Sequence, residues 1–275
     1  MHPILIEFDS FTIYTYGFCI AVGAVLGFAY MAQQGKKLFN LTFDQSNTLL
    51  LILVAGGIVG GKIFIILEDP TLYLSHPQNL FSGNGFVFYG SLVTCIPLML
   101  WYFKKHNIPL WPMLDVMAIV ICILHGWGRI GCFMAGCCYG KPTDSIFGIT
   151  FTNPVCQADP LNTPLHPTQL YESALIFTLL LGLLLLKRQK KFDGQLFLIY
   201  LIAYATGRAV LEFFRGDLER GFLIEDYLSY SQFISLLLIA VAAYLYVKRR
   251  NTKLLTANTD LWKMKTSDKK YNAKP

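Results

Sequence analysis

Long runs of apolar residues, separated by short polar segments, recur seven times along the chain. Each run has about 18 or more residues, which is the length an α-helix needs to cross the hydrocarbon core of a bilayer. The pattern therefore predicts seven transmembrane helices. The predicted spans are Tyr14–Gln34, Ser46–Leu67, Gly85–Phe103, Trp111–Gly131, Thr168–Leu186, Gly194–Phe214 and Ser229–Val247.

Composition supports a membrane protein. Hydrophobic residues make up 54% of the 275 residues and charged residues only 15%, with a mean hydropathy of +0.47, whereas about a quarter of the residues of a soluble domain are charged. A soluble helical protein of this composition would expose too much apolar surface. We expect an all-α, polytopic integral membrane protein with a small irregular extracytoplasmic loop region. The first ten residues lack Lys and Arg, so no cleavable signal peptide is expected.

The positions of the basic residues predict the topology. Most of the 23 Lys and Arg residues follow the first, third, fifth and seventh predicted spans. Because cytoplasmic loops are enriched in Lys and Arg, the N-terminus is expected outside and the C-terminus in the cytoplasm. Residues 1–250 would form one transmembrane catalytic domain, and residues 251–275 a basic, disordered cytoplasmic tail near anionic lipid. The net charge of +6 then requires no nucleic-acid partner.

Polar residues inside the predicted spans gather near the outer surface of the membrane. Ionisable groups are costly inside a bilayer and are therefore candidates for function. In the predicted topology, the residues at the outer level are Lys62, Tyr89, Arg129, Glu172, Arg208, Glu212 and Arg215. Asp115 differs because it lies near the inner end of its span. For Lys62 and Asp115, a structural ion pair is an equally good interpretation.

Helical spacing groups some of these residues further. Tyr204, Arg208 and Glu212 follow one another at intervals of four, so they share one stripe of a helix. His125 and Arg129 are likewise one turn apart, although a single histidine in an apolar helix is usually satisfied locally.

The longest predicted loop lies on the outer side, over about residues 132–167. It is rich in Gly and Pro, and loops of this length are often functional. Glycines allow backbone N–H groups to approach a ligand closely. The loop also holds Cys132, Cys137, Cys138 and Cys156, on the side of the membrane where disulfides are stable.

We expect a disulfide bond from Cys137 or Cys138 to Cys156. The cysteine spacing matches no common Cys₄ or Cys₂His₂ zinc pattern, so no metal site is expected. The remaining cysteines, Cys19, Cys95 and Cys122, are interpreted as small apolar residues within helices.

Four ordered motifs resemble the signature of the bacterial prolipoprotein diacylglyceryl transferases. They are Gly-Arg-Ile-Gly-x-Phe-x-x-Gly-x-x-x-Gly at 128–140, His-Pro-Thr-Gln-Leu-Tyr-Glu at 166–172, Phe-Tyr-Gly-Ser-Leu at 88–92, and Tyr-x-x-x-Arg-x-x-x-Glu-Phe-Phe-Arg at 204–215. Their order, their spacing and the seven predicted spans agree, so the likeness covers about Tyr14 to Val247.

The resemblance implies a transferase of the bacterial cytoplasmic (inner) membrane. Such an enzyme moves the diacylglyceryl group of phosphatidylglycerol to the lipobox cysteine of a prolipoprotein signal peptide and releases glycerol phosphate. Its partners would be these two substrates and membrane lipid, with no cofactor. The implied catalytic residues are Arg129, Arg208, Tyr89, His166, Tyr204 and Glu212. The implied substrate-binding residues are Gly128, Gly131, Cys132, Gly140, Gln169, Glu172, Arg215 and Tyr16.

Three positions depart from the family pattern. Cys132 stands where the family has Asn, Cys137 stands where it has an acidic residue, and Tyr89 stands where it often has His. A phenol is a poorer base than an imidazole near neutral pH. The identity of the group that deprotonates the acceptor therefore stays open.

Other functions remain as alternatives. Cys137, Cys138 and Cys156 suit a membrane thiol–disulfide carrier, and the motifs suit a related lipid transferase with another acceptor. A transporter is also compatible with charges inside a membrane. It is the weaker interpretation because these charges stay at one depth.

The topology can be tested by cysteine accessibility. A cysteine introduced between residues 187 and 191 should react with a membrane-impermeant thiol reagent only in permeabilised cells, because this segment is predicted to be cytoplasmic. A cysteine introduced between residues 141 and 166 should react in intact cells, above the background of the native cysteines. Labelling of the 187–191 segment in intact cells would overturn the predicted topology.

Overall fold

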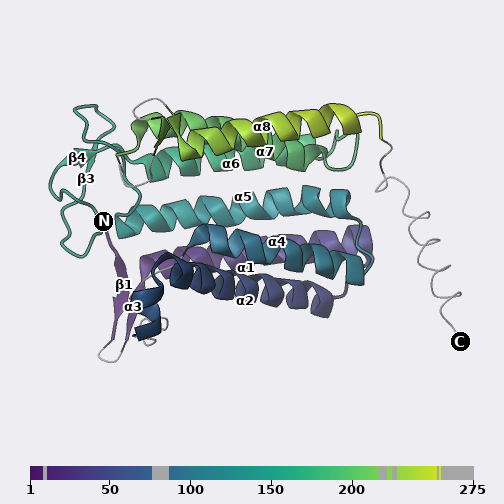
Figure 1. Cartoon of the computed structure of the whole chain (residues 1–275), viewed down its shortest axis with the longest axis horizontal. Helices are drawn as coiled ribbons and strands as arrows, with labels where there is room; N and C mark the ends of the chain where they lie inside the picture. The colour runs from purple at the N-terminus through teal and green to yellow at the C-terminus, as the bar shows by residue number, and fades with distance from the viewer. Residues whose placement is uncertain (9–10, 76–86, 217–221, 225–227, 253, 255–275) are drawn as a thin grey trace, which may run out of the picture. The chain divides into compact units, whose positions relative to one another are not determined.

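Seven long α-helices dominate the described part of the chain. The structure is a computed structural model that describes all residues except 9–10, 76–86, 217–221, 225–227, 253 and 255–275 (Figure 1). The long helices are α1 (Thr15–Phe39), α2 (Phe43–Glu68), α4 (Phe88–Lys105), α5 (Leu110–Ala135), α6 (Thr168–Leu186), α7 (Gln195–Leu211) and α8 (Tyr230–Arg249). The short helices are α3 (Pro70–Ser75) and the 3₁₀ helix η2 (Glu212–Phe214).

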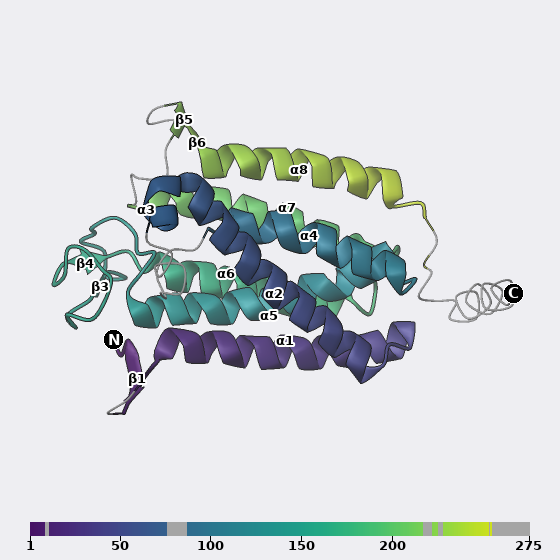
Figure 2. The same ribbon diagram turned by 60° about the horizontal axis from the view of Figure 1, so that its bottom comes forward.

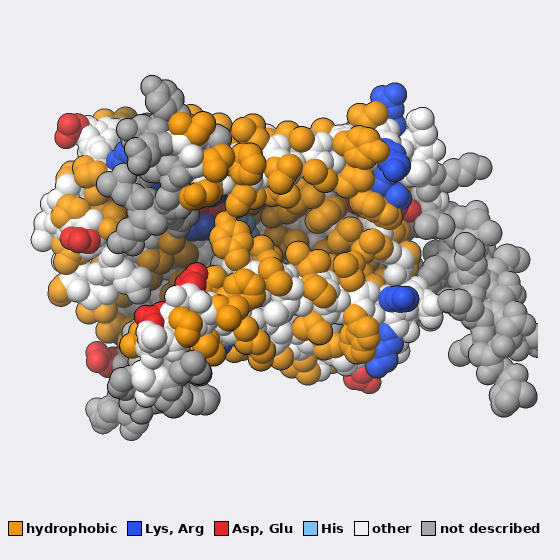
Figure 3. Space-filling view, in the orientation of Figure 1, with side chains coloured by type: hydrophobic (Ala, Val, Ile, Leu, Met, Phe, Trp, Pro, Cys, Tyr) orange, Lys and Arg blue, Asp and Glu red, His pale blue; other side chains and the backbone are white. Residues whose placement is uncertain are grey.

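These helices confirm the predicted all-α membrane fold. Among the described residues, six helices are long and apolar enough to cross a membrane, namely all the long ones except α4. Helix α4 has only 18 residues and ends in Lys104 and Lys105, and the predicted start of its span at Gly85 lies outside the described residues. Figure 3 shows the flanks of the helices covered mainly by hydrophobic side chains. This exposure suits contact with lipid.

The chain forms two compact units. Among the described residues, the first comprises Met1–Tyr30 and those from Leu114 onward, and the second comprises those of Met31–Met113. The prediction of a single domain over residues 1–250 stays a prediction. Most of the predicted basic tail, from residue 251 onward, lies outside the described residues.

Within the ranges that the structure describes, three short antiparallel strand pairs accompany the helices. They are β1 (Ile4–Glu7) with β2 (Thr12–Tyr14), β3 (Ile149–Thr150) with β4 (Pro164–Leu165), and β5 (Phe222–Ile224) with β6 (Leu228–Ser229). In the second pair Ile149 lies opposite Leu165, which closes the segment between α5 and α6 into a compact loop. Figure 2 shows β3 and β4 beyond the C-terminal end of α5.

The first unit has its core where α5, α6 and α7 pack together. The core residues are Ala118, Ile119 and Cys122 of α5, Ile176 and Leu183 of α6, and Leu196 and Tyr200 of α7. Helix α8 packs against α7 (Figure 1). Its N-terminus is capped by Ser229 and Gln232, which satisfy backbone N–H groups of the first turn reciprocally.

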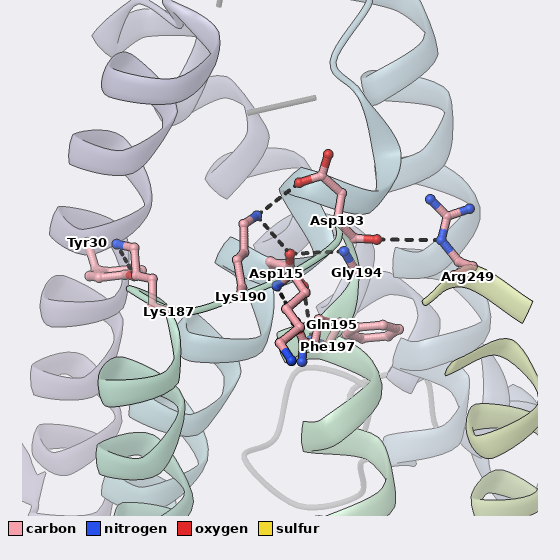
Figure 4. Close-up of polar contacts among 10 residues, drawn as sticks. Tyr30, Asp115, Lys187, Lys190, Asp193, Gly194, Gln195, Phe197 and Arg249 are labelled. Carbon is pink, nitrogen blue, oxygen red and sulfur yellow. Dashed lines mark hydrogen bonds and ion pairs between the residues drawn. The ribbon is translucent and has the colours of Figure 1, made fainter. Parts of the chain in front are cut away.

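Asp115 has a structural role in this unit. Its carboxylate accepts hydrogen bonds from Lys190 Nζ at 3.1 Å and from the backbone N–H groups of Gly194 (2.9 Å) and Phe197 (3.1 Å). Figure 4 shows these contacts converging on the start of α7, with Asp193 also bound to Lys190. The carboxylate therefore supplies acceptors for N–H groups that the first turn of a helix leaves unpaired. These contacts support the interpretation of Asp115 as part of a structural ion pair.

The second unit is built on close packing of α2 against α4. Ser91 Oγ donates to the carbonyl of Gly57 and Thr94 Oγ1 to the carbonyl of Gly56, both at 2.7 Å. A Cβ on Gly60 would lie 2.0 Å from Thr94 Oγ1 and 2.5 Å from the backbone oxygen of Gly90. Small residues thus allow the two backbones to approach, as they do in many membrane helix pairs.

This packing predicts different effects for two neighbouring glycines. Gly60→Ala should destabilise the protein by about 1–3 kcal/mol because the new methyl group overlaps the α4 backbone. Gly57→Ala is the matched control, since its Cβ would meet only Cys95 Sγ at an ordinary 3.6 Å. Thermal unfolding of both variants in detergent would measure the difference. Equal midpoints for the two variants would contradict the packing described here.

Candidate functional site

Glu172 is the centre of a polar network between three helices of the first unit. Its side chain on α6 is only 2% exposed. Oε1 lies 3.1 Å from Nε2 of His125 on α5 and accepts a hydrogen bond from the Tyr204 hydroxyl on α7 at 3.0 Å. Oε2 lies 3.1 Å from Nε of Arg129, also on α5. Nε of Arg129 also lies 3.3 Å from Nε2 of His125, so the two α5 side chains meet at the carboxylate.

Two glycines bring the helices close enough for this network. At Gly126 the Ser173 hydroxyl of α6 donates to the α5 backbone at 3.2 Å, and a Cβ would lie 2.7 Å from the ring of Phe177. At Gly207 a Cβ would lie 2.3 Å from the side chain of Leu175, so α7 also approaches α6 closely. The glycines place α5 and α7 within reach of the same carboxylate.

Arg208 joins the network from α7. Its Nη1 lies 2.6 Å from Oε2 of Glu212, one turn further along the chain. Arg208 also interacts electrostatically with Glu172 and with Tyr204, as Arg129 does. Tyr204 itself stacks on Tyr200, with ring centroids 5.8 Å apart. The structure thus brings together Arg129, Glu172, Tyr204, Arg208 and Glu212, all of which the sequence had singled out.

The loop between α5 and α6, predicted above as the outer loop and called so below, is bound to the start of α6 and the end of η2. The backbone N–H of Gly140 donates to the carbonyl of His166 at 2.8 Å, and that of Lys141 donates to the carbonyl of Phe214 at 2.9 Å. A Cβ on Gly140 would lie 2.3 Å from the Phe214 oxygen and 2.7 Å from the Cβ of His166. Glycine is therefore required at position 140 by backbone packing. The His166 ring pairs through Nδ1 with the Tyr171 hydroxyl at 3.2 Å.

Three cysteines form a cluster beside this junction. The Sγ atoms of Cys132, Cys137 and Cys138 all lie within 4.8 Å of one another. All seven cysteines are free thiols, so the predicted disulfide bond to Cys156 was wrong. Cys156 packs instead in an apolar cluster with Phe151 and Leu165, which linear spacing did not reveal.

Neighbouring thiols and arginines act on Cys138. Hydrogen bonds with the thiols of Cys132 and Cys137 lower the pKa of Cys138 well below its usual range, and they outweigh the opposing effect of burial. The guanidinium groups of Arg129 and Arg215 act in the same direction. The pKa of Cys137 is raised, chiefly by its hydrogen bonds with the other two thiols and then by burial. Cys138 is therefore the first of the two loop cysteines to carry a negative charge.

A hollow of about 330 Å³ lies next to the cluster. Its lining includes Cys138, Tyr139, Gly140, Pro142, Leu165 and Gly216. All of these residues come from the outer loop and from the segment that follows η2. Cys138 is the member of the thiol cluster that borders this hollow.

The remaining predicted site residues lie in varied surroundings. Gly131 and Tyr16 are in contact, since a Cβ on Gly131 would lie 3.1 Å from the Tyr16 ring, whereas a Cβ on Gly128 would meet nothing within 4 Å. Gln169 is fully buried, and Arg215 is 6% exposed. Tyr89 belongs to the second unit, at the start of α4, and is 58% exposed. Its part in this site stays a prediction.

Three members of the site were not among the predicted catalytic or substrate-binding residues. His125 binds the central carboxylate, and its spacing of one turn from Arg129 was the available signal. Thr168 donates to the carbonyl of Cys138 at 2.7 Å, from within the 166–172 motif. Cys138 completes the thiol cluster, but no sequence signal distinguished it from its neighbour.

Comparison with known proteins identifies the family. A family model described as prolipoprotein diacylglyceryl transferase matches residues 3–248. A phosphatidylglycerol–prolipoprotein diacylglyceryl transferase of Clostridium tetani is 38% identical over 247 residues, which are 90% of this chain and 97% of the relative. A second such protein, numbered 2, of Clostridium perfringens is 35% identical over 259 residues, covering 90% and 94%. One from Dehalococcoides mccartyi strain BAV1 is 29% identical over 248 residues, covering 90% and 93%. The chain belongs to the prolipoprotein diacylglyceryl transferase family.

Proposed function

We propose that the chain transfers the diacylglyceryl group of phosphatidylglycerol to the lipobox cysteine of prolipoproteins and releases glycerol phosphate. The observation that carries the proposal is the family match over residues 3–248, together with relatives whose names state this activity. Family membership and six candidate spans make the chain a multi-pass protein of the bacterial inner membrane. The same match favours a transferase over a thiol–disulfide carrier or a transporter.

The proposed orientation places the N-terminus outside and the C-terminus in the cytoplasm. Its support is the accumulation of Lys and Arg after alternate helices, as in the last turns of α1, α4 and α8. The thiol cluster and the arginine network would then face the outer leaflet. Both substrates are anchored in the membrane, so a site at headgroup depth suits them.

Arg129 and Arg208 are the proposed clamp for the phosphate. Their ion pairs engage Nε of Arg129 and Nη1 of Arg208. A guanidinium carries five N–H donors, so each arginine can hold a carboxylate and a phosphate oxygen at once. As the bond to the glycerol carbon breaks, negative charge grows on the leaving phosphate. Arginines held in place before the reaction stabilise that charge.

The pairing of the two arginines suits an anionic substrate. Arg129 and Arg208 each pair with a glutamate through one nitrogen, Nε of Arg129 with Glu172 and Nη1 of Arg208 with Glu212. A phosphodiester carries one negative charge, and its oxygens would accept from other N–H groups of the two guanidinium groups. Glu172 acts here as a positioning residue, because it holds the Arg129 side chain through Nε. His125 and Tyr204 in turn orient the carboxylate.

Reconstitution with defined substrates tests the proposed activity. The purified full chain, placed in phosphatidylglycerol vesicles with a lipobox peptide, should add a diacylglyceryl group to the peptide cysteine and release glycerol phosphate in equal amount. Mass spectrometry of the peptide and assay of the released phosphate ester measure the two products. A peptide with Ser in place of the cysteine is the control. Absence of both products from correctly folded protein would reject the proposed function.

Lysine variants test the phosphate clamp. Arg129→Lys and Arg208→Lys each keep the positive charge but lose the two-pronged donor, so each should lower turnover by about 10²-fold or more. Arg188→Lys, in the exposed segment after α6, is the matched control and should retain full turnover. Thermal unfolding in detergent would establish that each variant is folded. A folded Arg208→Lys protein with full activity would exclude the clamp.

A further inference from the structure

The three clustered thiols have the spacing of ligands to a single metal ion. Their Sγ atoms lie within 4.8 Å of one another. A zinc–sulfur bond of about 2.3 Å in tetrahedral geometry places neighbouring sulfurs roughly 3.8 Å apart, whereas a disulfide requires about 2 Å. His, Cys, Asp and Glu residues elsewhere in the described ranges add no fourth ligand to this group.

The backbone that carries these thiols is held by buried side chains. Gln169 Nε2 donates to the carbonyl of Cys137 at 2.6 Å, and Thr168 Oγ1 donates to the carbonyl of Cys138 at 2.7 Å. Gln169 is fully buried, and Thr168 is 2% exposed. The backbone of Cys138 is left-handed, with φ of 60°. This conformation brings the consecutive side chains of Cys137 and Cys138 together near that of Cys132. The fold therefore holds the three cysteines in position before any metal binds. Metal sites in proteins are commonly supported by such hydrogen bonds behind the ligands.

We propose that Cys132, Cys137 and Cys138 bind a Zn²⁺ ion whose fourth position receives the acceptor thiol as a thiolate. Three protein ligands and one open position are the usual arrangement of catalytic zinc. A thiol that coordinates zinc is deprotonated at neutral pH. The linear spacing predicted no metal site because it resembles no common zinc motif, but the folded loop brings the sulfurs together. The inference rests on the proposed function for the identity of the acceptor.

The step that this site supports is a thiol alkylation. The acceptor S–H releases its proton to water as sulfur binds zinc. The thiolate then attacks the glycerol carbon that bears the phosphate ester, so a C–S bond forms and a C–O bond breaks. The electron pair of the C–O bond leaves with the oxygen of glycerol phosphate. The thioether product is a weak zinc ligand, and water replaces it.

The neighbouring charges suit this arrangement. Zn²⁺ with three thiolates carries one net negative charge, and a bound acceptor thiolate makes it two. Arg129 and Arg215 both interact electrostatically with Cys138 and offset that charge. Arg129 also holds the Glu172 carboxylate at 3.1 Å. The acceptor thiolate and the leaving phosphate would therefore both lie near Arg129.

Metal content is the first test. The full chain, purified in detergent under reducing conditions, should bind one Zn²⁺ per molecule, and Co²⁺ put in its place should show thiolate charge-transfer absorption. Cys132→Ser, Cys137→Ser and Cys138→Ser should each abolish that absorption. Cys156→Ser, in the same loop but outside the cluster, should retain it. Thr168→Val should weaken binding by about 10–100-fold. Wild-type protein without zinc, or a triple serine variant that binds like the wild type, would overturn the site.

Acceptor binding is the second test. A lipobox peptide should shift the Co²⁺ spectrum of the wild-type protein, and the same peptide with Ser for Cys should not. A Co²⁺ spectrum that does not change when the cysteine peptide is added would overturn the open fourth position.

Zinc dependence of the reaction is the third test. Removal of zinc should abolish diacylglyceryl transfer, and added Zn²⁺ should restore it. Full transfer by verified metal-free protein would reject the zinc inference and leave the proposed function standing. Zinc-loaded protein that releases no glycerol phosphate would reject the proposed function, while the metal measurements would still decide the site.

Discussion

The buried carboxylate of Glu172 is the constraint on which the arrangement of the first unit depends. A carboxylate that is 2% exposed is stable only when its oxygens are paired, and here His125, Arg129 and Tyr204 pair them from two other helices. Those contacts require α5, α6 and α7 to approach closely, which glycines at positions 126 and 207 permit. The close packing at these glycines and the contacts of Glu172 therefore require the same arrangement of α5, α6 and α7. The position of the proposed phosphate clamp follows from it.

The first turns of α6 connect this network to the outer loop. Thr168 and Gln169 hold the backbone of the thiol cluster, and Glu172, one turn further on, holds Arg129. One short helical segment thus positions both halves of the proposed reaction, the acceptor thiol and the leaving phosphate. The loop between α5 and α6 has no long secondary structure, but its backbone is held in place because buried polar groups of α6 bind its carbonyls. Loops that carry function on a rigid scaffold follow the same principle.

Charges inside the predicted spans serve two different purposes. Asp115 is satisfied by Lys190 and by the first N–H groups of α7, so it stabilises a helix start and has the partners it needs within the protein. In the arginine network, Arg129 and Arg208 pair with Glu172 and Glu212 through one nitrogen each, and the proposed phosphate would accept from their other N–H groups. The cost of placing charge in a membrane is common to both. Burial alone therefore does not distinguish a structural charged residue such as Asp115 from a residue of the candidate site. The groups that pair with each residue do.

Apolar length and helical spacing were enough to predict the helices and the members of the arginine network. Helix ranges such as α2 and α6 follow from apolar length, which is a local property of the chain, and the motifs named Arg129, Tyr204 and Arg208 through their spacing along helices. The central position of Glu172 could not be predicted from spacing, because its partners His125, Arg129 and Tyr204 come from other helices. The structure also shows a cluster of three free thiols where a disulfide bond was expected. Spacing along an irregular loop does not report distances between sulfurs, since these depend on backbone angles such as the left-handed turn at Cys138 and on contacts with a distant helix.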